Sequence, residues 1–122
     1  MGAKGSFHPP KWYHQLLNAW CEAHNVRFGG HLMGEDTLQA QISWAGACMP
    51  CYEHMGIPGI DHLTRSLRWP AERSFILTPK QCSSVSNQLG KPRTLAEMYG
   101  VSSQGLDFED RKRIGHWLMM LG

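Results

Sequence analysis

Hydrophobic positions along the chain alternate between helical spacing and short strand-like runs. Apolar residues recur every three to four positions in two long segments near the ends, residues 10–24 and 107–121, and this spacing predicts a helix in each. A third such segment, residues 37–52, and a fourth, residues 74–89, are also predicted helices, although Pro79 suggests that the fourth begins near that residue. Three shorter runs predict strands between them: residues 26–28, 57–63 and 93–96.

Residues that begin or end helices stand at the borders of these segments. Asp36 or Thr37 can cap the second helix, and Asp107 the last, because their side-chain oxygens accept hydrogen bonds from free N–H groups of the first turn. Gly56 and Gly90 follow the second and third helices as stop signals. The predicted order is one helix followed by three strand–helix units.

The helical spacing also predicts which side chains face the core. Trp44 has the spacing of a core residue, and the first helix carries an apolar face that includes Trp12, Leu16 and Trp20. The side chains expected to point inward from the second and last helices are Leu38, Ile42, Ala45, Met49, Tyr52, Phe108, Ile114, Trp117, Leu118 and Leu121.

Strands joined by helical crossovers of this length run parallel, so the predicted fold class is α/β, built from parallel β-α units with an N-terminal helix. A complete eight-stranded barrel needs about 250 residues, and the chain has 122. We therefore expect a partial (β/α)8 TIM-barrel segment over residues 10–122, after a flexible segment at residues 1–9. Because three strands leave edges and one core side open, we expect a homo-oligomer or the remainder of a longer barrel to cover them.

Composition and charge limit the classes of protein and partner that the sequence is compatible with. Hydrophobic residues make up 42% of the chain and charged residues 18%, as in a globular protein, and the net charge is +2. The one basic run, Arg111 to Arg113, is typical of a solvated helix face, so no nucleic-acid partner is predicted. No apolar run approaches the roughly 20 residues of a membrane span, and no signal peptide opens the chain. A soluble protein without a membrane partner is expected, in an unspecified compartment.

Acidic residues follow each predicted strand. In parallel α/β folds ligand sites gather at the carboxyl ends of strands, where loops converge. Two carboxyl groups at such a rim can divide the work of glycosidic cleavage: one protonates the leaving oxygen, and the other attacks the anomeric carbon or activates water. Each acid alone could instead cap a helix or a turn. The candidates at the three strand ends are His31, Glu35, Asp61, His62, Glu97 and Tyr99.

Aromatic rings suit a carbohydrate substrate because they stack on the apolar faces of sugar rings. Trp69, beside Pro70 in a connection, and Tyr99 are the candidates for this role. The prediction includes a carbohydrate substrate and no cofactor.

Four segments carry a resemblance to a known family: Gly-His-Leu-Met-Gly-Glu at 30–35, Ile-Pro-Gly-Ile-Asp-His-Leu at 57–63, Ser-Ser-Val at 83–85 and Arg-Thr-Leu-Ala-Glu-Met-Tyr-Gly at 93–100. They resemble bacterial barrel-type glycoside hydrolases, in particular α-L-rhamnosidase-like and β-galactosidase-like catalytic domains. The resemblance extends from Trp12 to the last residue and matches the middle to later strands of that barrel. It implies a (β/α)8 fold and hydrolysis of glycosides, with Glu35 as general acid, Glu97 as second catalytic carboxylate, and His31 and Asp61 lining the substrate subsite.

Two alternatives to a glycosidase fragment stay open from the sequence. Cys21, His24, Cys48 and Cys51 have the residue types and local spacing of a tetrahedral zinc site, which predicts a small zinc-stabilised binding or assembly module. The same cysteines could be small buried apolar residues on helices. The other alternative is a non-catalytic half-barrel that self-associates through its open sheet.

Overall fold

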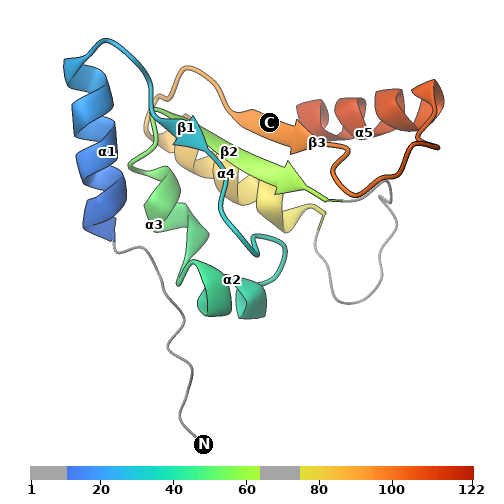
Figure 1. The fold of residues 1–122 in the computed structure, drawn as a ribbon, viewed down its shortest axis with the longest axis horizontal. Helices are drawn as coiled ribbons and strands as arrows, with labels where there is room; N and C mark the ends of the chain where they lie inside the picture. The colour runs from blue at the N-terminus through green and yellow to red at the C-terminus, as the bar shows by residue number, and fades with distance from the viewer. Residues whose placement is uncertain (1–10, 64–74) are drawn as a thin grey trace, which may run out of the picture.

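The computed structural model describes residues 11–63 and 75–122. Within them the fold is mixed α/β, with a small three-stranded parallel sheet and five helices (Figure 1). In chain order the elements are α1 (Lys11–Ala23), β1 (Gly29–Gly30), α2 (Leu38–Trp44), α3 (Cys48–Tyr52), β2 (Ile57–His62), α4 (Leu77–Gln88), β3 (Leu95–Met98) and α5 (Phe108–Leu121).

The sheet has the order β1-β2-β3, and both strand pairs are parallel. This confirms the predicted parallel β-α units. Two glycines allow β1 to lie close to β2, because a Cβ atom on Gly59 would come within 2.5 Å of the carbonyl oxygen of Gly30. The close approach fixes where β1 ends, and therefore where the following loop starts.

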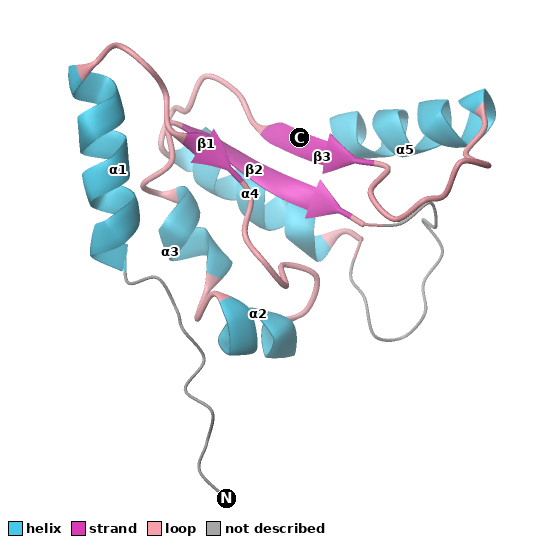
Figure 2. Ribbon diagram, viewed as in Figure 1, coloured by secondary structure: helices cyan, strands magenta, loops and turns pink. Residues whose placement is uncertain are grey.

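The two faces of the sheet have different environments. On β2, Ile60 and His62 are buried, and α4 lies behind the strand (Figure 2). Successive side chains on a strand point to opposite faces, so Asp61 faces the other way, as does its register partner Glu97 on β3. Leu95 lies two residues before Glu97 on the same side of β3 and is 46% exposed. The core therefore fills one face of the sheet and leaves the other open.

The core lies between β2 and the helices α3, α4 and α5. Two predicted helix caps are confirmed at its borders: the Thr37 hydroxyl accepts from Ala40 N at 3.1 Å, and the Asp107 carboxylate accepts from Asp110 N at 2.8 Å. These caps satisfy backbone N–H groups that the first helical turn leaves free. The main buried apolar residues of the core are Ala45, Cys48, Tyr52, Met55, Ile60, Cys82, Val85, Leu106, Ile114 and Leu118.

The prediction of one continuous second helix is wrong, because the structure has two shorter helices there, α2 and α3. Gly46 has φ of +78°, a left-handed conformation that ends α2, and α3 starts again at Cys48. The continuous inward face predicted from Leu38 to Tyr52 therefore does not exist. Three side chains expected in the core are instead exposed on α2, by 58 to 62%: Leu38, Ile42 and Trp44.

Other boundaries and orientations also differ from the predictions. The first and third strands lie at residues 29–30 and 95–98, each two to three residues later than the alternation of apolar and polar residues predicts. Phe108, expected to face the core, is 90% exposed because it occupies the first position of α5, before the helix reaches its neighbours. On α1 the apolar face of Trp12, Leu16 and Trp20 is exposed as well. Among the described helices, none combines the length and apolar character needed to cross a membrane.

Gly59→Ala is expected to destabilise the fold by about 1–3 kcal/mol, because the added methyl group would collide with the β1 backbone. Chemical denaturation measures this change. Gly105→Ala is the control, since its Cβ would meet only Ser103 Oγ at 3.7 Å. Equal stability of the two variants would contradict the close β1–β2 approach.

Candidate functional site

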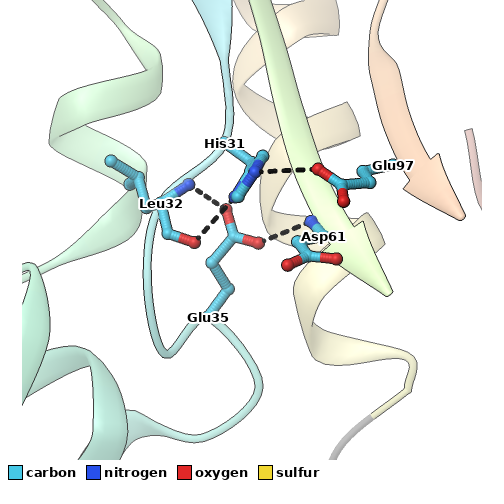
Figure 3. Close-up of polar contacts among 5 residues, drawn as sticks. All are labelled: His31, Leu32, Glu35, Asp61 and Glu97. Carbon is cyan, nitrogen blue, oxygen red and sulfur yellow. Dashed lines mark hydrogen bonds and ion pairs between the residues drawn. The ribbon is translucent and has the colours of Figure 1, made fainter. Parts of the chain in front are cut away.

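Three side chains from three different segments meet at the carboxyl ends of the strands. His31 follows β1, Asp61 lies in β2 and Glu97 in β3, and one imidazole or carboxylate atom of each lies within 4.8 Å of the others (Figure 3). His31 Nε2 is 3.1 Å from Glu97 Oε2. Asp61 and Glu97 are register partners, so adjacent parallel strands direct both carboxylates to the same open face.

Glu35 lies beneath this group and is 4% exposed. One carboxylate oxygen accepts hydrogen bonds from Leu32 N at 3.0 Å and from the Tyr52 hydroxyl at 2.6 Å. The other accepts from Asp61 N at 2.9 Å (Figure 3). The carboxylate thereby joins the loop after β1, helix α3 and the end of β2. Both of its oxygens are engaged within the protein.

The backbone of Glu35 is held as firmly as its side chain. Its carbonyl oxygen accepts from Gln41 Nε2 and from the Thr78 hydroxyl, each at 3.0 Å. Buried polar groups are stable only when they are hydrogen-bonded, and here α2 and α4 supply the donors. Sequence patterns do not identify the supporting residues Gln41, Tyr52 and Thr78. The one available signal was the polar hydroxyl of Tyr52 at a predicted core position.

Burial raises the pKa of Glu35, whereas the hydrogen bonds from Tyr52, Asp61 N and Leu32 N and the nearby His31 lower it; the net pKa lies above its usual value. The pKa of Tyr52 is also raised, by burial and by the charge of Glu35. The Tyr52 hydroxyl therefore stays protonated and remains a donor to Glu35.

Burial and the charge of Glu97 raise the pKa of Asp61, and His31 partly opposes the effect. Burial lowers the pKa of His31, but its hydrogen bond to the Leu32 carbonyl and the charges of Asp61, Glu35 and Glu97 together raise it. The geometry agrees: His31 Nδ1 lies 3.2 Å from the Leu32 carbonyl and Nε2 lies beside a Glu97 oxygen, so two acceptors face the ring. Only the imidazolium form donates from both nitrogens.

Not all predicted site residues lie in this group. His62 is buried on the opposite face of β2 from Asp61, and its ring lies 5.4 Å from the ring of Phe75. The Tyr99 hydroxyl donates to the Arg111 carbonyl at 3.0 Å, which directs the ring toward α5. Trp69 lies outside the described residues. His31, Glu35, Asp61 and Glu97 are the predicted residues that lie together.

The structure does not gather the four residues of the predicted zinc site. His24 Nδ1 donates to the Trp20 carbonyl at 2.7 Å, and Cys48 and Cys51 are buried on α3, where they face the core. Burial, with the charge of Glu35, raises the pKa of Cys48 to about 12, which disfavours the thiolate that a metal requires. Over residues 11–63 and 75–122, the one cluster of metal-ligating side chains with closely spaced donor atoms is His31, Asp61 and Glu97.

A hollow of about 250 Å³ opens beside Asp61 at the carboxyl end of β2. Its lining is mixed: Leu32, Met33, Trp44 and Phe75 form apolar walls, and the polar residues are Glu35, Asp36, Asp61, His62 and Thr78. A second hollow of the same volume lies between β3, α4 and α5. His31, Asp61 and Glu97 do not line it.

No protein-family model, curated protein or solved structure matches the chain. A functional proposal therefore depends on the geometry and chemistry of the residues at the strand ends.

Glu35→Gln is expected to change how stability depends on pH. The pKa of Glu35 is raised in the folded state, so its ionisation opposes folding as pH rises above the unfolded value of about 4.3. The stability of the wild type relative to Glu35→Gln should therefore fall as the pH rises above about 4.3. Urea unfolding across this range measures the difference.

Glu109→Gln, at an exposed position of α5, is the control for this measurement. It removes one carboxyl group without touching the hydrogen bonds of Glu35. A wild-type advantage over Glu35→Gln that grows with pH would show that the three hydrogen bonds outweigh burial, and would contradict the raised pKa.

Proposed function

We propose that this chain is a glycoside hydrolase-type catalytic segment that acts on glycosidic bonds through the carboxyl groups of Asp61 and Glu97. The observation that carries the proposal is their placement: both lie at the carboxyl ends of paired parallel strands, on the open face, with oxygens within 4.8 Å. Retaining glycosidases hold their two carboxyl groups about 5–5.5 Å apart. The spacing therefore favours cleavage through a covalent glycosyl-enzyme intermediate.

The two carboxyl groups have environments suited to different tasks. The pKa of Asp61 is raised by burial and by Glu97, so it can hold a proton and deliver it to the leaving oxygen. Glu97 is ion-paired with His31, and its carboxylate oxygen is the nucleophile that attacks the anomeric carbon. After the aglycone departs, Asp61 accepts a proton from the water that hydrolyses the intermediate.

Glu35 has a different role in this proposal from the general acid that the family resemblance implies. A general acid must present a proton to the leaving oxygen. Both oxygens of Glu35 accept hydrogen bonds from protein groups, and the side chain is 4% exposed. We therefore assign proton donation to Asp61, while Glu35 positions the two strand ends.

The proposed setting of this chemistry is a (β/α)8 barrel of which the chain forms a part. In a barrel wall the strands are parallel, helices cover one face, and the other face points into the barrel. The described residues have this arrangement, and the face that carries the carboxylates is open (Figure 1). The free edges of β1 and β3 are where neighbouring strands of such a barrel, or of another copy, would pair.

A divalent cation site is a second candidate function for the same group. His31, Asp61 and Glu97 are common metal ligands, and the three donor atoms lie within 4.8 Å of one another. Asp61 Oδ1 is buried without a hydrogen-bond partner among the described residues. A cation would give that oxygen a partner and would replace the contact between His31 and Glu97.

Asp61→Asn and Glu97→Gln are each expected to lower hydrolysis of an activated aryl glycoside by about 10²- to 10⁴-fold, because each removes one half of the acid–nucleophile pair. Initial rates over a panel of p-nitrophenyl glycosides measure the effect. Glu109→Gln is the matched control at an exposed site and should keep full activity. Unchanged rates in both site variants would refute the proposal.

Removal of divalent cations with EDTA separates the two candidate functions, the cation site and chemistry by the carboxyl groups alone. Loss of hydrolysis on dialysis against EDTA, with recovery on adding a divalent cation, would support the cation site. Activity that resists EDTA would support chemistry by the carboxyl groups alone.

A further inference from the structure

The hollow beside Asp61 gathers exposed apolar side chains that the proposed chemistry does not use. Met33 and Trp44 are 60% and 58% exposed, and both line it together with the buried ring of Phe75. Leu32 adds a partly buried wall. An apolar lining directly next to a carboxyl group is typical of a site that orients a ligand for reaction.

Trp44 is held in place by the loop that carries the site residues. Gly34 has φ of +71°, and a Cβ atom there would come within 2.6 Å of Trp44 Cδ1. One side of the indole thus packs directly on the backbone between His31 and Glu35, a contact that only glycine permits. The ring is a positioned surface rather than a freely rotating side chain.

Two of the polar residues that line the hollow, Glu35 and Thr78, are hydrogen-bonded within the protein. Both carboxylate oxygens of Glu35 accept hydrogen bonds, and the Thr78 hydroxyl donates to the Glu35 carbonyl. A pyranose ring placed here would leave most of its hydroxyl groups without partners, at a cost for each. An aromatic or other apolar ring has no such requirement. Asp61, which lines the same hollow, is only partly buried.

We propose that this hollow binds the aryl aglycone of the glycoside, with its glycosidic oxygen at Asp61. The inference depends on the proposed function, in which Asp61 protonates the leaving group, and it adds the class of leaving group. The volume of about 250 Å³ fits one ring. An apolar cavity of roughly 150 Å³ holds benzene, and pockets for drug-sized ligands measure roughly 300–1,000 Å³.

The test uses phenol as the aryl probe and myo-inositol as a polyhydroxylated six-membered ring. Indole N–H resonances of the ¹⁵N-labelled full chain are followed by NMR during each titration. Phenol should shift the Trp44 resonance and leave Trp12 unchanged; Trp12 is equally exposed at 58% but lies on α1. Trp44→Ala should weaken phenol binding about three- to tenfold, and Trp12→Ala should not change it.

The outcomes separate this inference from the proposed function. If phenol shifts Trp44 in the wild type and in Asp61→Asn, but no glycoside is hydrolysed, the aryl site stands and the hydrolase proposal fails. If myo-inositol shifts Trp44 as strongly as phenol does, or if phenol perturbs Trp44 no more than Trp12, the aryl-aglycone inference is overturned whatever the activity.

Discussion

The buried carboxylate of Glu35 is the interaction on which the arrangement of the strand ends depends. It accepts from the backbone of the loop after β1, from the backbone of β2 and from a hydroxyl on α3. A buried charge costs free energy unless it is fully hydrogen-bonded, so the three segments must keep their relative positions for the carboxylate to be tolerated. His31 and Asp61 lie on two of those segments.

A second constraint is the separation of the two sheet faces. Ile60 and His62 join the helices in the core, while Asp61 between them points to the open face. Because side chains alternate between the two faces, the six residues of β2 contribute both to the core and to the group of side chains at the strand ends. The same alternation explains why His62, adjacent to Asp61 in sequence, packs against Phe75 and not beside His31.

The sequence predicted the features that depend on local chemistry or on topology. Thr37 and Asp107 cap helices as their residue types suggest, and strands joined by helices run parallel. Acids after successive parallel strands could therefore be expected at one rim. Sequence patterns did not predict the helix break at Gly46, because a left-handed residue within an otherwise periodic segment depends on tertiary packing. For the same reason Trp44 was assigned to the core, although it is exposed beside the site.

The difference between the buried acid Glu35 and the two acids on the open face could be recognised only in the structure. In the sequence, Glu35, Asp61 and Glu97 are three acids in equivalent topological places. Hydrogen bonding and burial separate them: both oxygens of Glu35 accept hydrogen bonds in a side chain that is 4% exposed, whereas Asp61 and Glu97 are less buried and lie together on the open face. Burial and the charge of Glu97 raise the pKa of Asp61, and in the proposed function this favours the protonated acid. In the proposed function, the register pairing of Asp61 with Glu97 therefore has two effects: it places the two carboxyl groups together, and the charge of Glu97 favours a protonated Asp61.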